Sequence, residues 1–360
     1  MSRRPIIHDL VNSKELSALD NYLTEHPEKI DECGYFGYTA LHIAALHGSN
    51  SIIEKLIERG SRALDSLDKQ GQTPLFFAAL GGRVSTIELL IRLGSQSLDT
   101  PDLTGQTPLY AAAMADAHDV VELLVKLGSQ CLDTPNHEGK TPLFIAVLRN
   151  CLSTVETLIR LGSRALDTPN NEGVTPLHEA SRKSVKMMKL LMKAGSISID
   201  TPDLYGSTPM HYAATGPSGY AMIEYLVKSG SQAIDRRNDD GKTPLYVAAR
   251  LTLFSNIRML VKLGSRAIDT PNNLGQRPIE AIDDSITDCH SSIRFLFALG
   301  ASPFTENEES LLRKFMSTEP YEERVLRKRY VTFFGQSLVA RLLFDLKRQS
   351  CLQRRIKRFI

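Results

Sequence analysis

Residues 107–140 read TPLYAAAMADAHDVVELLVKLGSQCLDTPNHEGK, and this stretch decides the fold because close copies of it fill most of the chain. The triplet Thr-Pro-Leu, or a variant of it, begins at positions that lie 33 to 35 residues apart. These positions are Thr39, Thr73, Thr107, Thr141, Thr175, Thr208, Thr243 and Arg277. Such a phased series predicts an array of repeats rather than one large core.

Each copy predicts two short helices and a loop. Thr before Pro suits a helix start, because the hydroxyl can accept from a free backbone N–H and Pro in the first turn gives up no hydrogen bond. The second helix has apolar residues at helical spacing, as at Val121 and Leu124, and stops at a glycine such as Gly128. The turn-forming run 132–139 predicts a projecting loop, which we call the finger.

This order of helix, turn, helix and finger, with TALHIAA from Thr39, TPLHEAS from Thr175 and TPMHYAA from Thr208, resembles the ankyrin repeat. The resemblance covers residues 6–302 and implies an all-α ankyrin-repeat solenoid with projecting β-turn fingers. The finger is one residue longer than the familiar form, so we expect it to be extended or bulged. The repeats are expected at residues 31–64, 65–98, 99–132, 133–166, 167–199, 200–234, 235–268 and 269–302.

The two ends of the array differ from its middle. Residues 1–30 lack the triplet but predict capping helices, because the apolar face of a terminal repeat needs a cover. Residues 303–360 hold 13 Lys or Arg and 7 Asp or Glu, and predict a basic helical C-terminal segment. This segment could cap the solenoid, dock a partner, or contact acidic lipid, nucleic acid or an import receptor. The docking interpretation uses Leu338, Leu342 and Leu346, which are similar to the elongin-binding helix of a SOCS box although Leu342 replaces the usual Cys.

Composition points to an ordinary folded protein. A formal net charge of +2 gives no global attraction to nucleic acid or to an anionic membrane. The five cysteines are widely spaced and form no CxxC pair, which predicts reduced thiols in a cytoplasmic or nuclear protein. No apolar run is long enough to predict a membrane span, and no signal peptide is expected at the N-terminus.

No pattern of catalytic chemistry survives inspection. The chain has no GxGxxG or GxxxxGK[ST] loop, no HExxH and no GxSxG, so we expect no enzyme activity, cofactor or metal. The resemblance implies that His42, His178 and His211 bond structurally across the turn between repeats. One Asp recurs in every finger, and packed layers would keep these carboxylates about 10 Å apart, too far to share an ion. We therefore expect them to form local turns. They are Asp31, Asp65, Asp99, Asp133, Asp167, Asp200, Asp235 and Asp269.

The resemblance also implies that a partner binds along the finger tips, meaning the two residues before each finger glycine, and the exposed ends of the inner helices. The expected contact residues are Tyr35, Phe36, Leu46, Leu80, Leu103, Met114, Leu148, Arg149, Arg182, Lys183, Leu204, Tyr205 and Arg250. The inner-helix positions run from apolar to basic, which predicts a groove for a segment with an apolar half and an acidic half. Alternatively, the apolar residues pack on neighbouring helices and the basic ones are solvated.

The sequence thus predicts a noncatalytic protein–protein interaction scaffold. Two alternatives stay open: a substrate-recognition adaptor of a ubiquitin ligase that docks through its C-terminal segment, and an effector with which an intracellular microbe engages host proteins. The sixth repeat is irregular, because Thr215–Gly219 contains one Pro and two Gly. This predicts a kink or a flexible joint between the fifth and sixth repeats.

Overall fold

The computed structural model describes residues 5–282, 289–299 and 301. These residues are helical, with turns and loops between the helices and no β-strand among them, which confirms the all-α fold. The chain divides into two compact units, Met1–Leu204 and Tyr205–Ile360, which we call unit 1 and unit 2.

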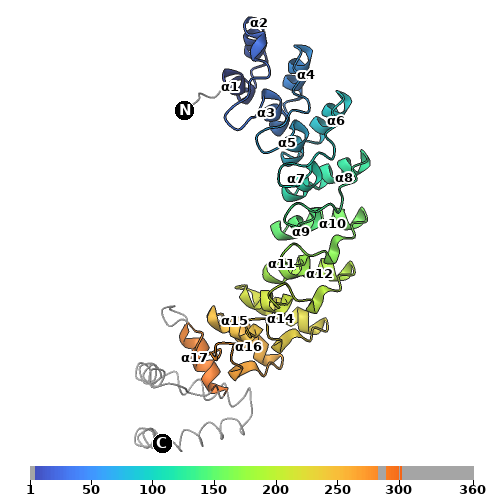
Figure 1. Ribbon diagram of the computed structural model, residues 1–360. Helices are drawn as coiled ribbons and strands as arrows, with labels where there is room; N and C mark the ends of the chain where they lie inside the picture. Colours follow the sequence, from blue (N-terminus) through green and yellow to red (C-terminus); the bar gives the residue numbers. More distant parts are fainter. Residues whose placement is uncertain (1–4, 283–288, 300, 302–360) are drawn as a thin grey trace, which may run out of the picture. The chain divides into compact units, whose positions relative to one another are not determined.

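Unit 1 consists of two capping helices and five helix pairs, built in two rows (Figure 1). The capping helices are α1 (Ile6–Ser13) and α2 (Leu16–Glu25), followed by the 3-10 turn η1 (Pro27–Lys29). The inner helices are α3 (Ala40–His47), α5 (Pro74–Leu80), α7 (Pro108–Met114), α9 (Pro142–Arg149) and α11 (Pro176–Lys183). The outer helices are α4 (Asn50–Glu58), α6 (Val84–Arg92), α8 (His118–Lys126), α10 (Leu152–Arg160) and α12 (Val185–Lys193). Each inner helix packs on the next inner helix, so the core runs along the row.

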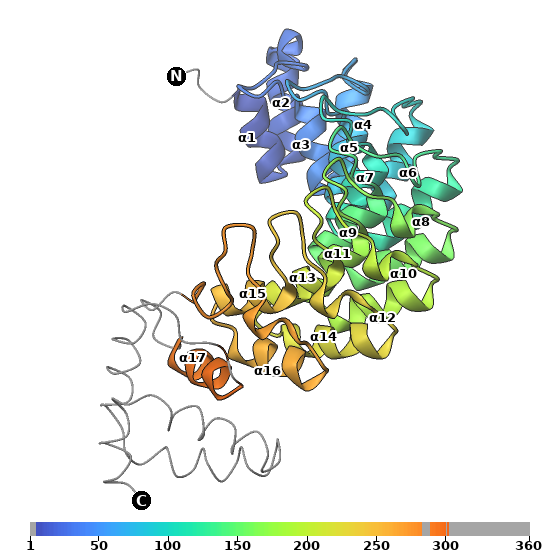
Figure 2. The ribbon, with the colours of Figure 1, turned by 60° about the horizontal axis from the view of Figure 1, so that its bottom comes forward.

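Unit 2 continues the same pattern. It contains α13 (Pro209–Thr215), α14 (Gly219–Lys228), α15 (Pro244–Arg250), α16 (Phe254–Lys262) and α17 (Cys289–Ala298). Short 3-10 turns enter the fingers of both units: η2 (Ala165–Asp167), η3 (Ser198–Asp200), η4 (Ala233–Asp235) and η5 (Ala267–Asp269). Figure 2 shows two finger loops of unit 2, coloured gold and orange, projecting on the same side.

The eighth repeat departs from the others in its inner helix. Residues 277–282 form a turn instead of a helix, although α17 supplies the outer helix of that repeat. The position that holds the capping Thr elsewhere is Arg277, whose N–H donates to the Glu280 carboxylate at 2.7 Å. Without a hydroxyl acceptor at this position, the helix start is not capped as in the other repeats. The predicted C-terminal segment 303–360 lies outside the described residues.

The irregular turn of the sixth repeat is held in place within unit 2. The buried Asn256 of α16 donates from its amide to the carbonyls of Ala214 and Gly216, at 3.1 and 2.7 Å. At Gly219 a Cβ would lie 1.9 Å from the Ala213 carbonyl oxygen, so only glycine fits there. Hydrogen bonds from α16 therefore hold this turn within unit 2. The flexible joint between the fifth and sixth repeats stays a prediction.

The helix starts use the chemistry that the sequence predicts. The Thr73 hydroxyl accepts from the backbone N–H of Phe76 at 3.2 Å, and Thr107 and Thr141 make the same cap. Each inner helix from α5 to α15 also has Pro in its first turn. A cap of this kind is worth about 1 kcal/mol in stability.

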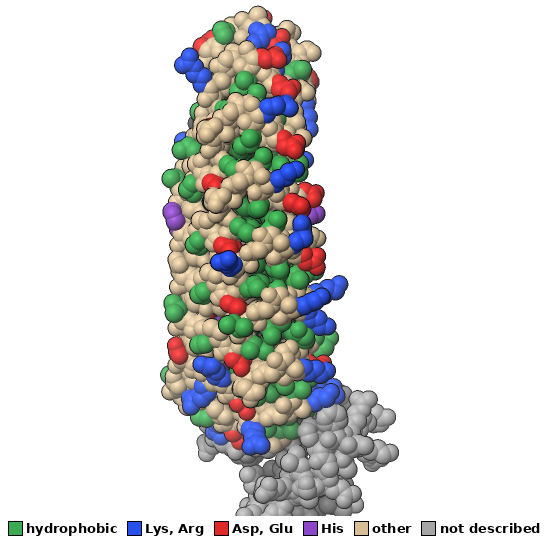
Figure 3. Space-filling model, turned by 90° about the vertical axis from the view of Figure 1, so that its right-hand side faces the viewer, with side chains coloured by type: hydrophobic (Ala, Val, Ile, Leu, Met, Phe, Trp, Pro, Cys, Tyr) green, Lys and Arg blue, Asp and Glu red, His purple; other side chains and the backbone are tan. Residues whose placement is uncertain are grey.

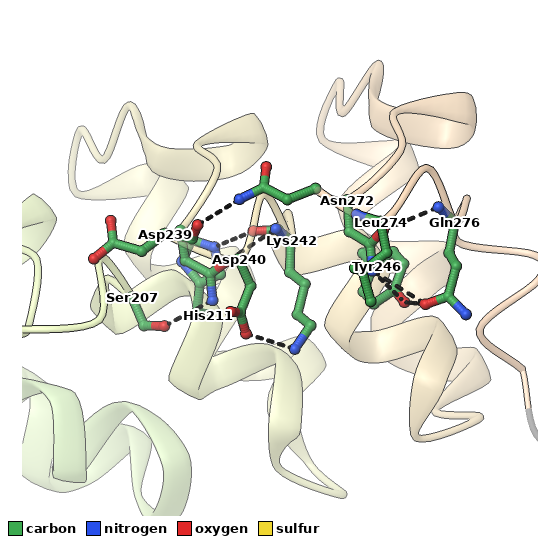
Figure 4. A network of polar contacts seen from close by, with 11 residues as sticks. Ser207, His211, Asp239, Asp240, Lys242, Tyr246, Asn272, Leu274 and Gln276 are labelled. Atoms are coloured by element: carbon green, nitrogen blue, oxygen red, sulfur yellow. Dashed lines mark hydrogen bonds and ion pairs between the residues drawn. The ribbon is translucent and has the colours of Figure 1, made fainter.

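Two of the buried histidines, His42 and His211, bridge neighbouring repeats, as the resemblance implies. His42 accepts from the Thr39 backbone N–H through Nδ1, so its Nε2 carries the proton and donates to the Gln72 carbonyl at 3.0 Å. His211 makes the matching contact with the Lys242 carbonyl, also at 3.0 Å (Figure 4). With its one proton on Nε2, the His42 ring is neutral. Burial lowers the pKa of His42, which favours this neutral form.

Tyrosine replaces histidine in two repeats and keeps a similar bridge. The Tyr246 hydroxyl accepts from the Asn272 amide at 3.0 Å and lies 3.2 Å from the Gln276 amide oxygen, to which it donates (Figure 4). Burial, with the nearby Glu138, raises the pKa of Tyr110 to about 12. The two tyrosines at this position are thus part of the core.

The finger carboxylates correct a prediction, because they are not only local turn formers. Asp99 accepts from the Ser129 hydroxyl at 2.5 Å and from the Gln130 backbone N–H at 2.9 Å, both on the segment that enters the next finger. The same pair of bonds recurs at Asp31, Asp65, Asp133, Asp167 and Asp235. In these six fingers one carboxylate therefore ties the finger to the segment that enters the next finger.

We expect Asp167→Ala to lower the free energy of unfolding by about 2 kcal/mol at neutral pH, since a hydrogen-bonded carboxylate would be lost. Burial raises the pKa of Asp167, but the bonds from Ser196, Ile197 and Ser198 outweigh it, so the pKa lies below its usual value. Its contribution is present above the unfolded-state pKa of about 3.9 and is lost as the pH falls through the folded value. Urea unfolding followed by circular dichroism measures both effects. Asp119→Ala on α8 is the control, and an equal loss there would contradict the assignment.

We expect His42→Tyr to flatten the pH dependence of stability below neutrality. The folded pKa of His42 is lowered, so the unfolded state binds a proton more readily. The stability that neutral His42 contributes is complete above about pH 6.5 and declines as the pH falls from there to the folded pKa. Tyr is accommodated at this position in α7 as Tyr110. Thermal unfolding between pH 5 and 8 tests this, and parallel curves for the two proteins would show that His42 does not titrate in this range.

Candidate partner-binding surface

The finger tips of unit 1 form a continuous hydrogen-bonded row. The first tip residue of each finger donates its backbone N–H to the carbonyl of the second tip residue of the preceding finger. Lys69 donates to Phe36 at 3.0 Å, and Leu103 donates to Gln70 at 2.8 Å. The series continues through His137 to Thr104, Asn171 to Glu138 and Leu204 to Glu172. In unit 2 it runs through Asp239 to Tyr205 and Asn273 to Asp240.

Several fingers after the first, in which the matching position is Gly34, are also closed internally by one side chain. Asp68 accepts from the backbone N–H groups of Gln70 and Gln72, both at 2.8 Å. Asp102, Asn136, Asn170 and Asn272 make the same two bonds in their fingers. Tips held in this way lose little freedom on binding, which favours affinity.

An aromatic cluster stands at the N-terminal end of the row. Tyr35 and Phe36 are 71% and 54% exposed and lie edge to face, with ring centroids 5.1 Å apart. Phe36 approaches Tyr38 at 5.7 Å, and Tyr38 approaches Phe77 of α5 at 5.1 Å. The ammonium group of Lys69 lies 5.1 Å from the centre of the Tyr35 ring. We call Tyr35, Phe36, Tyr38 and Phe77 the aromatic end.

The other predicted apolar tips are also exposed. Leu103 is 70% and Leu204 is 69% exposed in unit 1, and Tyr205 is 63% exposed in unit 2. Sequence reasoning did not select Leu274, which is 84% exposed in unit 2, although it occupies an equivalent tip position. Exposed apolar side chains that recur at one structural position are a feature of interaction surfaces.

The apolar contact residues predicted at the ends of the inner helices, which we call the apolar column, are less exposed than the sequence predicts. Leu46, Leu80, Met114 and Leu148 are only half-buried, so part of each side chain packs on its neighbours and part faces solvent. The carbonyl of Leu46 accepts from the Arg83 guanidinium at 3.0 Å, which satisfies the end of α3. The packing interpretation of these four residues therefore fits in part, and the groove stays a prediction.

The positive charge of the predicted basic contact residues is partly neutralised within unit 1. Arg182 pairs with Glu179 at 3.1 Å and Lys183 lies 3.8 Å from the same carboxylate. Lys183 also donates to the Leu148 carbonyl, at 2.5 Å, and so belongs to the packing of α9 and α11. Arg149 is exposed at the end of α9. Glu179 was missed as a site residue, although its spacing from Arg182 and Lys183 on one helix signals the pairs. In unit 2, Arg250 is exposed at the end of α15.

The described part of the chain gives little support for a reactive thiol, a metal site or a membrane span. Burial raises the pKa of the Cys131 and Cys151 thiols, which makes them poor nucleophiles. Within residues 5–282, 289–299 and 301, no three His, Cys, Asp or Glu side chains are grouped to hold a metal ion. No helix in these ranges is long and apolar enough to cross a membrane. The predicted docking residues Leu338, Leu342 and Leu346 lie outside the described residues.

Comparison with known proteins agrees with this architecture. A family model described as ankyrin repeats (3 copies) matches residues 7–102, 93–168, 161–233 and 199–272. The chain therefore belongs to the ankyrin-repeat family, and its repeats form a protein–protein interaction module. Among solved structures it is similar to the human ASB11 ankyrin repeat domain, with a TM-score of 0.54 and 21% identity. That match covers 62% of this chain and 98% of the ASB11 domain. No curated protein sequence matches the chain.

We expect Gly71→Ala to disturb the finger row more than Gly94→Ala does. Both glycines have positive φ, +79° and +99°, so each variant strains its backbone. A Cβ on Gly71 would lie 3.0 Å from the Leu103 backbone nitrogen, whereas one on Gly94 would meet nothing within 4 Å. Faster hydrogen exchange at the Leu103 amide in Gly71→Ala alone is the expected result. Equal exchange in the two variants would mean that the finger tips are not held by this contact.

Proposed function

We propose that this protein is a noncatalytic scaffold that binds a protein partner along the finger tips and the exposed ends of the inner helices of unit 1. The observation that carries the proposal is the exposure of Tyr35 and Phe36 on a finger fixed by hydrogen bonds. Large aromatic side chains held in one geometry are frequent hot spots of protein interfaces. Exposing them without a partner is costly for a soluble protein.

The chemistry of the surface suggests what the partner presents. The aromatic end and Leu103 suit apolar side chains, because burying their exposed faces removes apolar area from water. Lys69 beside Tyr35, and Arg149 further along the row of inner helices, suit acidic groups. Glu179 reduces the positive charge around Arg182 and Lys183. The acidic half of the partner therefore faces Arg149 more than the other two cations.

A cytoplasmic or nuclear location is part of the proposal. The described cysteines Cys33, Cys131 and Cys151 are free thiols, which fits a reducing compartment. The adaptor and effector alternatives have no supporting observation in the part of the chain that the structure describes.

The proposal is tested by isolating partners on the full-length chain and measuring their affinity for variants. We expect Tyr35→Ser/Phe36→Ser to weaken binding of the partner by about tenfold or more, as loss of an interface hot spot does. Ile197→Ser is the matched control, because Ile197 is an 83% exposed apolar residue of unit 1 that lies outside the finger tips. Isothermal titration calorimetry measures both affinities. Wild-type affinity in the finger-tip variant would exclude this surface as the binding site.

A further inference from the structure

The outer helices α14 and α16 of unit 2 carry aromatic side chains that the outer helices of unit 1 lack. Tyr220 in α14 and Phe254 in α16 occupy equivalent places, four residues before Glu224 and Arg258. Tyr220 is 44% exposed. The five outer helices of unit 1 pack without an aromatic ring at this place, where they hold Asn50, Val84, His118, Leu152 and Val185.

A shallow hollow of about 240 Å³ lies on these two helices. Phe254, which lines it, also lies edge to face with Phe295 of α17, with ring centroids 5.5 Å apart. The hollow is smaller than the 300 to 1,000 Å³ or so that is usual for a small-molecule pocket, so it suits a few side chains of a peptide segment. We call it the α14–α16 hollow, and its lining residues are Tyr220, Phe254, Ser255, Arg258, Met259 and Lys262.

The α14–α16 hollow has a positive charge. Residues 241–268, which include α16, contain five Lys or Arg and no Asp or Glu. The one acidic residue of α14, Glu224, accepts from Lys228 at 2.7 Å, and this bond, with Lys262 nearby, lowers the pKa of Glu224. Lys262 makes no ion pair with any residue that the structure describes. Figure 3 views the side that bears the outer helices, where acidic and basic side chains alternate along one edge and then give way mostly to basic ones.

The chain itself contains a segment of complementary chemistry shortly after α17. Residues 304–312 read FTENEESLL, with three Glu, no Lys or Arg, and apolar residues at both ends. Aromatic and aliphatic side chains suit the rings of the α14–α16 hollow, and carboxylates suit its cations. Residues 313–360 hold all 13 Lys and Arg of the C-terminal segment, so they suit a basic hollow poorly.

The segment is tethered close to the α14–α16 hollow. The N–H of Ala301 donates to the Leu296 carbonyl at 3.1 Å, and the neighbouring Phe295 contacts Phe254 of the hollow. Residues 302–312 can extend to about 36 Å, at about 3.3 Å per residue. A short tether gives the segment an effective concentration on the order of 1 mM. Even the weak affinity that a shallow hollow offers is then sufficient for binding.

We propose that residues 304–312 bind in the α14–α16 hollow of the same chain, with apolar side chains against Tyr220 and Phe254 and glutamates facing Lys262. This contact covers aromatic surface that is costly to expose. A second copy of the chain or a separate protein is the less suitable occupant, because it would bind the same shallow hollow without the tether. The inference concerns unit 2 and does not depend on what the finger tips of unit 1 bind.

The test is carbodiimide cross-linking of the full-length chain at about 0.15 M salt, because this reagent joins a carboxylate to an amine that it contacts. We expect mass spectrometry of the digested protein to find Lys262 joined to Glu306, Glu308 or Glu309. A mixture of isotope-labelled and unlabelled protein distinguishes links within one chain from links between chains. Lys262→Arg keeps the positive charge but lacks the reactive amine, so we expect it to remove the link.

Phe304→Ser is expected to lower the yield of this link about threefold or more, since it removes an apolar contact and leaves the tether and the glutamates in place. Phe315→Ser, just beyond the segment, is the matched control and is expected to keep the yield within about twofold of the wild type. Equal yields in the two variants would mean that the tethered glutamates meet Lys262 only by chance. That result, the absence of a link at Lys262, links only between chains, or links chiefly to the glutamates of residues 319–323 would each overturn the proposal.

Discussion

The bond from a finger carboxylate to the segment that enters the next finger is the contact on which the rest of the structure depends. A single pair of short helices cannot bury enough apolar surface to be stable, so an array of this kind is held by its interfaces between neighbours. Hydrophobic packing between inner helices supplies most of the energy but is not directional. The two bonds of Asp99, to the Ser129 hydroxyl and the Gln130 N–H, are directional and fix where the next finger begins. His42 adds a directional bond from its repeat to the next one, at the Gln72 carbonyl.

The variability of the finger tips follows from these directional bonds. Because the Asp and His contacts set the spacing of the repeats, the finger tips need only their backbone groups to join the row. Their side chains are then free to differ, from Tyr35 and Phe36 in one finger to Asn171 and Glu172 in another. Function can vary at these positions without a cost in folding, since specificity resides in sites placed on the fold rather than in the fold itself.

The sequence predicted the parts of this structure that depend on local chemistry. The cap at Thr107 and the stop at Gly128 require only residues within one helix, so the pattern located them correctly. The role of Asp99 was predicted only in part, because its partner Ser129 lies 30 residues away, beyond the range of rules based on neighbouring residues. The interval of 29 or 30 residues between a finger Asp and a later Ser was a usable signal. The lost inner helix at Arg277 follows from the missing hydroxyl, whereas the half-burial of Leu46 depends on packing and could not be predicted from spacing.

An array of repeats supplies its own reference for detecting functional residues. When a position that holds Leu152 in α10 holds the exposed Tyr220 in α14, the helix geometry cannot be the reason, because α14 packs as the others do. The same argument applies to Phe36, whose carbonyl accepts from the next finger as the Gln70 carbonyl does. A residue that changes while its structural surroundings stay constant is not explained by folding. Both departures are exposed, and they add apolar area, which is the property that drives association.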